Sequence, residues 1–183
     1  MPRSSDARQR FIETAALLFQ QRGYSAVGLN ELIEKSQAPK GSFYHHFPGG
    51  KEELAKVALT FSGDYVARKT AGWIGDAKTP NEAACALLDS VADWFEGSGW
   101  TQGCPITTVA LEVTPENPEL HATVEEIFES WVEEISAHAE RLDTKHPRDW
   151  AECLLTQIQG AWIVGRIQKS RAPFNQIKAL YRD

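Results

Sequence analysis

Apolar residues along the chain recur mainly at intervals of three and four, the spacing that gathers them on one face of an α-helix. Near the start this face consists of Phe11, Ala15, Leu18 and Phe19, and Gly23 then ends the predicted helix. Alternation with a period of two, which is typical of strands, does not occur over any length. The pattern predicts an all-α fold with about nine helices. After the first helix, these span residues 28–35, 39–46, 51 to about 72, 80–95, from after Pro105 to about 113, from 118 onward, 147–169 and 173–182.

Prolines and glycines mark where several of these helices begin and end. Proline fits the first turn of a helix but not its interior, so Pro39 and Pro80 each indicate a start. Thr79 and Glu82 add the capping box that satisfies free backbone N–H groups at a helix N-terminus. Pro48-Gly49-Gly50 ends the helix that Pro39 begins, which keeps that helix short.

Composition narrows the class of protein. The apolar share of 42% and the charged share of 24% are those of a soluble globular chain, and no apolar run is long enough to span a bilayer. The polar N-terminus lacks the apolar stretch of a secretory signal, so we expect a cytoplasmic protein without a membrane partner. Three widely spaced cysteines indicate free thiols rather than disulfides or a zinc site, and the sequence predicts no metal and no cofactor.

Charge is distributed unevenly between the two ends of the chain. The formal net charge of −6 argues by itself against a nucleic-acid partner. Residues 1–56, however, contain eight Lys and Arg against six Asp and Glu, a balance of +2, whereas the remainder contains eleven against nineteen, a balance of −8. This asymmetry is typical of an anion-binding head joined to an acidic body.

The first three predicted helices form a helix-turn-helix preceded by a supporting helix. In this motif the last helix, here Pro39 to His46, is the one that enters a DNA groove. Phe43 and Phe47 lie four residues apart and are expected to anchor it. The remaining side chains suit phosphates and base edges, and the predicted contacts are Lys40, Gly41, Ser42, Tyr44, His45 and His46.

The two adjacent histidines leave alternatives open. Neighbouring positions on a helix point about 100° apart, which disfavours a shared metal ion for His45 and His46 and leaves DNA contact or ordinary packing. Tyr44 could likewise be a core aromatic. Lys51 stands at a helix start, where a positive charge is unfavourable unless an anion is near, so it is also a predicted phosphate contact. Cys104 lacks the histidine and acid of a nucleophilic site, so no catalytic residue is predicted.

The segment from Gly23 to Leu54 resembles the DNA-binding region of TetR-type transcriptional regulators. The similarity lies in Gly23-Tyr24, the run Lys40 to Tyr44, the pair His46-Phe47, and Lys51 to Leu54. The chain departs from the family at Val27-Gly28, where a pair of threonines is common, and at Gln37 and Pro39. The Gly28 backbone and Asn30 are therefore added to the predicted DNA contacts. Gly103-Cys104-Pro105 is similar to a subgroup associated with drug-efflux control.

The resemblance implies a homodimer with a DNA-binding domain over residues 1–50 and a ligand-binding and dimerisation domain over 51–183. It further implies a repressor that a small, largely apolar or aromatic effector releases from a palindromic double-stranded DNA operator. An activator, a protein-interaction module and an enzyme that uses the helical bundle remain as alternatives. The sequence does not specify the effector or the operator.

Six tryptophans occur in the chain, and buried indoles together can line an apolar pocket with polar N–H groups. The predicted ligand-binding residues are Phe61, Tyr65, Trp94, Trp100, Cys104, Phe128, Trp131 and Trp162. For the dimer interface we expect the last two helices, where Gly160 and Gly165 interrupt a helical pattern for a packing reason. The predicted interface residues are Leu154, Ile158, Ala161, Trp162 and Gly165.

Overall fold

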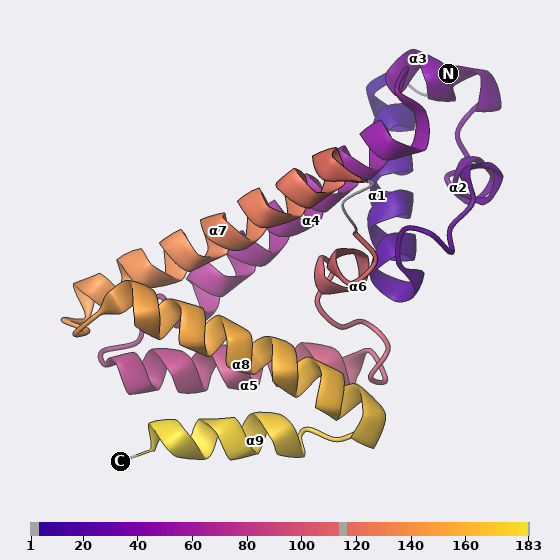
Figure 1. The fold of residues 1–183 in the computed structure, drawn as a ribbon. Coiled ribbons are helices and arrows are strands. Elements are labelled where there is room, and N and C mark those ends of the chain that lie inside the picture. Colours follow the sequence, from indigo (N-terminus) through magenta and orange to yellow (C-terminus); the bar gives the residue numbers. More distant parts are fainter. Residues whose placement is uncertain (1–3, 114–116, 183) are drawn as a thin grey trace. The chain divides into compact units, whose positions relative to one another are not determined.

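The structure is a computed structural model that describes residues 4–113 and 117–182. Every regular element in these residues is helical, which confirms the all-α prediction (Figure 1). The α-helices are α1 (Ser4–Arg22), α2 (Leu29–Lys35), α3 (Phe43–His46), α4 (Gly50–Ile74), α5 (Pro80–Gly97), α6 (Thr107–Ala110), α7 (Pro118–Arg141), α8 (Pro147–Gln168) and α9 (Ala172–Lys178). Two short 3₁₀ turns, Lys40–Ser42 and Ala179–Tyr181, adjoin α3 and α9.

Local sequence signals account for most helix ends. Gly23 follows α1 in a left-handed conformation with φ 79°, as the prediction required. Thr79 caps α5, because its side chain accepts a hydrogen bond from the backbone N–H of Glu82 at 3.1 Å. The Glu82 carboxylate accepts one in return from the N–H of Lys78 at 2.7 Å. The capping box is thus confirmed, with its return bond displaced by one residue.

The predicted helix over 39–46 begins as a 3₁₀ turn before it becomes α3. Both the backbone N–H and the hydroxyl of Ser42 donate to the carbonyl of Pro39, at 2.9 and 2.7 Å. In an α-helix the Pro39 carbonyl would accept from the residue four positions ahead. Here it accepts two hydrogen bonds from Ser42, three positions ahead, and these stabilise the tighter 3₁₀ turn. The result places Phe43 at the start of the α-helical part.

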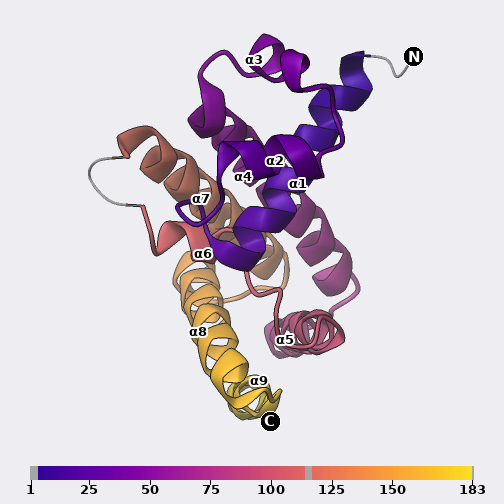
Figure 2. The same cartoon turned by 90° about the vertical axis from the view of Figure 1, so that its right-hand side faces the viewer.

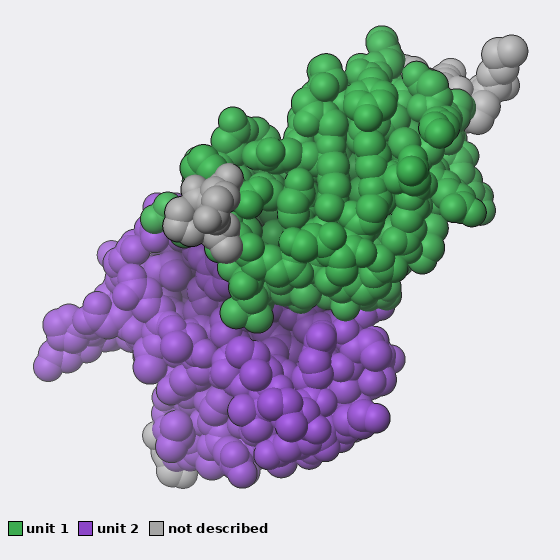
Figure 3. Space-filling model, turned by 45° about the vertical axis from the view of Figure 1, so that its right-hand side comes forward, with its two compact units in different colours: residues 1–64, 105–127 green, residues 65–104, 128–183 purple. Residues whose placement is uncertain are grey.

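The chain forms two compact units (Figure 3). The first, unit 1, consists of residues 1–64 and 105–127, and the second, unit 2, of 65–104 and 128–183. Helices α4 and α7 each contribute one part to either unit. The predicted division of function at residue 50 stays a prediction, and unit 1 contains a segment from the middle of the chain in addition to its N-terminal helices.

In unit 1 three phenylalanines form the centre of the core. The ring of Phe11 on α1 meets those of Phe43 and Phe47 edge-on, at centroid distances of 5.2 and 6.1 Å, and all three are fully buried. Helix α6 lies beside α1 (Figure 2), where the Thr108 hydroxyl donates to the carbonyl of Gln20 at 3.1 Å. The N-terminal three-helix region is therefore packed both on itself and on the 105–113 segment.

In unit 2, α5, α8 and α9 pack against one another (Figure 1). The buried ring of Phe95 on α5 contacts Trp162 on α8 and Phe174 on α9, at 6.5 and 6.4 Å. Gly165 permits this approach, because a Cβ there would lie 3.1 Å from the carbonyl oxygen of Ser170 and 3.4 Å from the ring of Phe174. Arg171 adds an ion pair to Asp93 at 2.9 Å.

Candidate DNA-binding and ligand-binding sites

The third helix presents its polar side chains outward because its two phenylalanines are held inward. Phe43 and Phe47 are fully buried, whereas the side chain of Tyr44 is 62% exposed. Two further predicted contacts, Lys40 and Gly41, are also exposed. This confirms that the two phenylalanines anchor the helix and excludes Tyr44 from the core.

The remaining contacts predicted on this segment are less uniform. His45 is exposed and His46 is half-buried, with their ring centroids 5.1 Å apart. Ser42 is also half-buried, and its hydroxyl is already donated to Pro39. Within the ranges 4–113 and 117–182, no three His, Cys, Asp or Glu side chains come together as a metal site would require.

Helix α2 is fixed against α1 by charged groups near the predicted contacts Gly28 and Asn30. Arg22 donates two hydrogen bonds to the Glu31 carboxylate, at 2.7 and 2.8 Å, and Lys35 pairs with the same group at 3.1 Å. The hydrogen bond from Arg22 is the main reason that the pKa of Glu31 falls to about 2. Gly28 is the exposed N-cap of α2 without a side-chain cap, and Asn30 is exposed beside it.

Lys51 is tied into unit 1 rather than extended into solvent. Its ammonium donates to the backbone carbonyl of Tyr24 at 2.7 Å and lies 4.0 Å from the centre of the Tyr24 ring. Burial lowers the pKa of Lys51, and the negative charge of Glu112 opposes that change. The start of α4 is thereby joined to the turn between α1 and α2, a contact that the helix-start argument did not predict.

A carboxylate from the 105–113 segment also binds that turn. Glu112 accepts a hydrogen bond from the backbone N–H of Ser25 at 2.6 Å. It lies so close to Gly23 that a Cβ at this position would overlap the carboxylate. The turn after α1 is thus held from two sides, by Lys51 through Tyr24 and by Glu112 through Ser25. For convenience we call Lys51, Tyr24, Ser25 and Glu112 the turn clamp.

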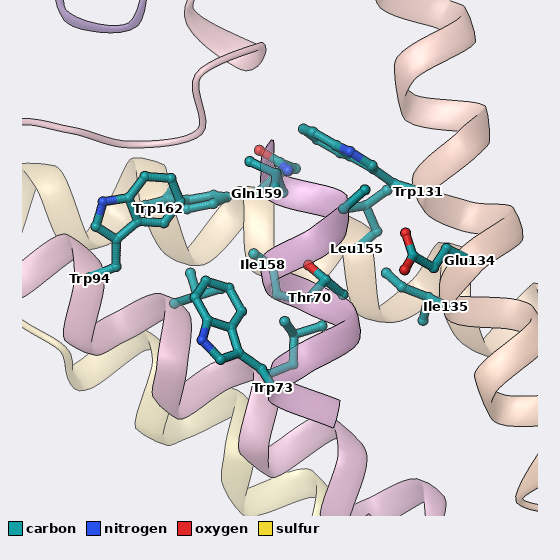
Figure 4. Close-up of a pocket in the computed structure, with 14 residues that line it drawn as sticks. Thr70, Trp73, Trp94, Trp131, Glu134, Ile135, Leu155, Ile158, Gln159 and Trp162 are labelled. Carbon is teal, nitrogen blue, oxygen red and sulfur yellow. The ribbon is translucent and has the colours of Figure 1, made fainter. Parts of the chain in front are cut away.

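Unit 2 contains a largely apolar pocket of about 470 Å³, including its open part (Figure 4). Four of the six tryptophans line it, one from each of the helices α4, α5, α7 and α8. Polar groups are few. The lining residues are Val66, Ala67, Thr70, Trp73, Leu87, Val91, Trp94, Trp131, Glu134, Ile135, Leu155, Ile158, Gln159 and Trp162.

Three predicted ligand-binding residues, Trp94, Trp131 and Trp162, line this pocket. Two others adjoin the lining: the ring of Tyr65 contacts Trp94 at 6.3 Å, and that of Phe128 contacts Trp131 at 5.2 Å.

The other three predicted ligand-binding residues lie elsewhere. Trp100 packs on Phe95 at 5.2 Å, and Cys104 is buried outside the lining. Phe61 belongs to unit 1, where it borders a shallow hollow with residues of α1 and α4.

Sequence reasoning missed Thr70, Trp73, Glu134 and Gln159 as lining residues. A signal for one of them was present, because Glu134 follows Trp131 by three positions on α7 and therefore shares its face of the helix. Thr70 and Trp73 are also three positions apart, on α4, and therefore share one face of that helix.

The residues predicted for the dimer interface lie on the covered side of α8. Leu154, Ile158, Ala161, Trp162 and Gly165 are all buried within one protomer. The opposite side of α8 carries exposed apolar residues, with Ile163 48%, Val164 41% and Ile167 77% exposed. Leu180 in the last turn is 72% exposed. A shallow groove between α8 and α9 includes Gly160, Val164 and Leu180.

A supporting helix followed by a short helix, a turn and an outward-facing third helix defines a helix-turn-helix DNA-binding protein. Residues 11–58 match the bacterial regulatory proteins of the tetR family, and residues 80–180 match the C-terminal domain of LmrA/YxaF-like transcriptional regulators. The chain therefore belongs to the TetR family of transcriptional regulators, and it is a regulator rather than an enzyme.

Individual relatives agree with this family. The chain is 36% identical to the HTH-type transcriptional regulator YxaF of Bacillus subtilis, over 72% of this chain and 69% of the relative. It is 29% identical to LmrA of the same organism, over 97% of this chain and 96% of the relative. Among solved structures, the reduced form of Escherichia coli NemR shares the fold with a TM-score of 0.85 at 22% identity, covering 95% of each chain. Along the described parts of the chain, the helices all fall short of the length and apolar character needed to cross a membrane.

Proposed function

We propose that this protein is a ligand-responsive repressor that binds a palindromic DNA operator as a homodimer in the cytoplasm. The observation that carries the proposal is the third helix, in which two buried phenylalanines direct Lys40, Tyr44 and His45 into solvent. A lysine, a phenol and an imidazole exposed within one short segment can contact phosphates and base edges. The other proposed DNA contacts are Gly28, Asn30, Gly41, Ser42 and His46.

The structure modifies the role that we propose for Lys51. Because its ammonium is already bound to Tyr24, it supports the DNA-binding turn and contributes positive potential rather than an extended side chain. Lys40 is exposed and makes the direct phosphate contact in this proposal. Family members usually act as dimers. Two recognition helices, α3 of each protomer, held about 34 Å apart would match successive major grooves of a palindrome.

The proposed dimer surface is the exposed apolar side of α8 together with the end of α9. Ile163, Ile167 and Leu180 are large, apolar and exposed, a combination that favours burial against a second copy. Gly160 supports this surface, because a Cβ there would meet nothing within 4 Å in its own protomer. A glycine inside a helix costs stability, and a closely approaching partner helix would explain its presence.

Effector binding in the unit 2 pocket would act on the DNA-binding region through helix α4, which contributes residues to both. Helix α4 starts at Gly50, next to Lys51 of the turn clamp, and continues to Thr70 and Trp73 of the pocket. The effector weakens operator binding only to the extent that it binds the DNA-incompetent state more tightly. The proposed pocket residues are those that line it, with Tyr65 and Phe128 as their support.

Selection of duplexes from a random pool by the purified protein tests this function. We expect an enriched palindrome whose half-sites are separated by about one helical turn. Tyr44→Phe and Lys40→Met should then weaken binding, and Lys40→Met should also reduce its dependence on salt because it removes a phosphate contact. Ala137→Ser, a change at an exposed position of α7 that belongs to neither the proposed DNA contacts nor the proposed dimer surface, serves as a control. Recovery of no preferred sequence, or of one without two-fold symmetry, would contradict the proposal.

A further inference from the structure

Tryptophan indoles form much of the wall of the unit 2 pocket. Trp94 lies between Trp73 and Trp162, with ring centroids 6.5 Å away in both cases. Trp131 supplies a fourth indole from α7. The face of an indole carries more negative potential than that of any other aromatic side chain, so several together attract a cation as well as an apolar group.

Glu134 is the one ionisable side chain that lines the pocket among the described residues. It is half-buried, and within the described parts of the chain it has no hydrogen-bond or ion-pair partner. Burial raises the pKa of this carboxyl. Partial burial of a carboxylate without a cation is unfavourable, and the described lining contains no lysine, arginine or histidine to compensate it.

The pocket has one end at which two indoles lie together and another end at which an indole lies near the acid. Figure 4 shows Trp94 beside Trp162 toward one end, and Trp131 with Glu134 toward the other. Thr70 and Ile158 lie between the two ends. The buried indole N–H of Trp162 has no hydrogen-bond partner, so it is free to donate to a ligand.

We propose that the pocket binds a lipophilic organic cation, that is, an ammonium group attached to an aromatic or similarly apolar body. The ammonium lies against Trp131 and pairs with Glu134, while the apolar body occupies the space bordered by Trp94, Trp162 and Trp73. This inference deepens the proposed function, on which it rests for the consequence of binding, by assigning the charge and chemical class of the effector.

The other charge classes fit the same walls less well. An anionic ligand would bring a second negative charge beside Glu134, with no positive group in the described lining to offset it. A neutral aromatic ligand would leave the carboxylate unpaired or require it to be protonated. A cation instead satisfies the carboxylate and uses the indole faces at once.

Binding of two probes of nearly equal shape tests the charge requirement directly. Benzyltrimethylammonium carries the cation, and neopentylbenzene replaces its nitrogen with carbon. Isothermal titration calorimetry on the full-length protein should give an affinity for the cation at least about tenfold above that for the neutral probe. Equal affinity for both, or tighter binding of neopentylbenzene, would overturn the inference.

Two substitutions identify the groups responsible. Glu134→Gln keeps the shape of the side chain and removes its charge, so it should lower affinity for the cation about tenfold while leaving the neutral probe unaffected. Glu133→Gln makes the same charge change at the adjacent, exposed position of α7 and should alter neither affinity. Trp73→Leu should weaken both probes, because this half-buried indole borders the apolar end. Retention of cation affinity by the Glu134→Gln variant would rule out the assigned role.

Operator release is measured separately, by adding each probe to the protein bound to its selected duplex. A cation that binds with the expected preference but leaves operator affinity unchanged supports the assigned ligand class and contradicts ligand-responsive repression. A neutral probe that binds the unmodified protein at least as tightly as the cation does, and that releases DNA, supports repression and overturns the ligand class.

Discussion

The ammonium of Lys51 is held at short range by two parts of one residue, the carbonyl and the ring of Tyr24. Such a contact contributes to folding as well as to the local potential, because it joins α4 to the turn before α2. At the scale of single residues, the Lys51 ammonium can therefore both stabilise the fold and contribute positive potential for DNA binding. Substitutions at Lys51 and at an exposed lysine, compared with each other, separate these two roles.

Lys51→Met should lower the free energy of unfolding by about 1–2 kcal/mol, since it removes a charge-assisted hydrogen bond and a cation–π contact while keeping most of the side-chain length. Thermal unfolding followed by circular dichroism measures this as a fall in Tm of a few degrees. Lys40→Met is the matched control: Lys40 is exposed, so its loss should weaken DNA binding and leave Tm unchanged. Equal Tm values for the two variants would contradict the structural role of Lys51.

His138 predicts a pH dependence of stability. It is buried, and the Arg141 guanidinium lies 2.6 Å from its Nδ1, so the neutral ring accepts this bond and carries its proton on Nε2. Burial, reinforced by Arg141, lowers the pKa of His138 in the folded state. The unfolded chain thus takes up a proton near the ordinary pKa of about 6.5 while the folded chain does not, and stability falls as pH decreases below that value. Denaturant unfolding between pH 7 and pH 5 should show a smaller loss for His138→Gln than for the unmodified protein.

At the scale of elements, the turn between α1 and α2 combines a required backbone conformation with a required contact. Gly23 has φ 79° and lies against the carboxylate of Glu112. Gly23→Ala should therefore destabilise the protein by about 1–3 kcal/mol, through left-handed backbone strain and displacement of Glu112. Gly72→Ala is the contrasting change, because this exposed position on α4 has free space around its Cβ and alanine favours a helix by about 0.5–1 kcal/mol. Urea unfolding of both variants checks the opposite signs.

Sequence patterns predicted the elements because their causes are local. The helical face through Phe11 and Phe19, the cap at Thr79 and the stop at Gly23 all involve neighbours within a few positions. The turn clamp could not be predicted this way, because Ser25 and Glu112 are separated by 87 positions. The shorter α3 likewise depends on how Ser42 satisfies one carbonyl, which periodicity does not encode.

The candidate pocket was predicted only in part for a related reason. Trp94, Trp131 and Trp162 were identified because large aromatic residues usually lie inside. Glu134 was not, since a glutamate among other acids on a helix is usually solvated. Its position three residues after Trp131 distinguishes it from Glu133, which is exposed, but this distinction depends on knowing which face of α7 is covered.

At the scale of the whole molecule, the exposed side of α8 predicts the oligomeric state. Gly160→Leu should convert the proposed dimer to a monomer, because a Cβ at this position meets nothing within 4 Å in its own protomer, whereas a leucine side chain would obstruct a partner at the proposed surface. Sedimentation velocity measures the change, with circular dichroism as the test that the protomer stays folded. Ala137→Leu introduces the same side chain at an exposed position of α7, outside the proposed dimer surface, and should leave the dimer intact. A dimeric Gly160→Leu protein would exclude this surface.

The contact of Glu112 with the turn at Gly23 and Ser25 also bears on how such a regulator can be re-engineered. A chimera that joins the first 50 residues to a foreign sensor would carry the reading helix without the carboxylate that holds the preceding turn. Transplanting residues 105–113 together with the N-terminal helices, or supplying an acid at the equivalent position of the new host, would retain that support. We therefore expect that DNA binding can be transferred to another protein only with two separate segments of this chain, the N-terminal helices and residues 105–113.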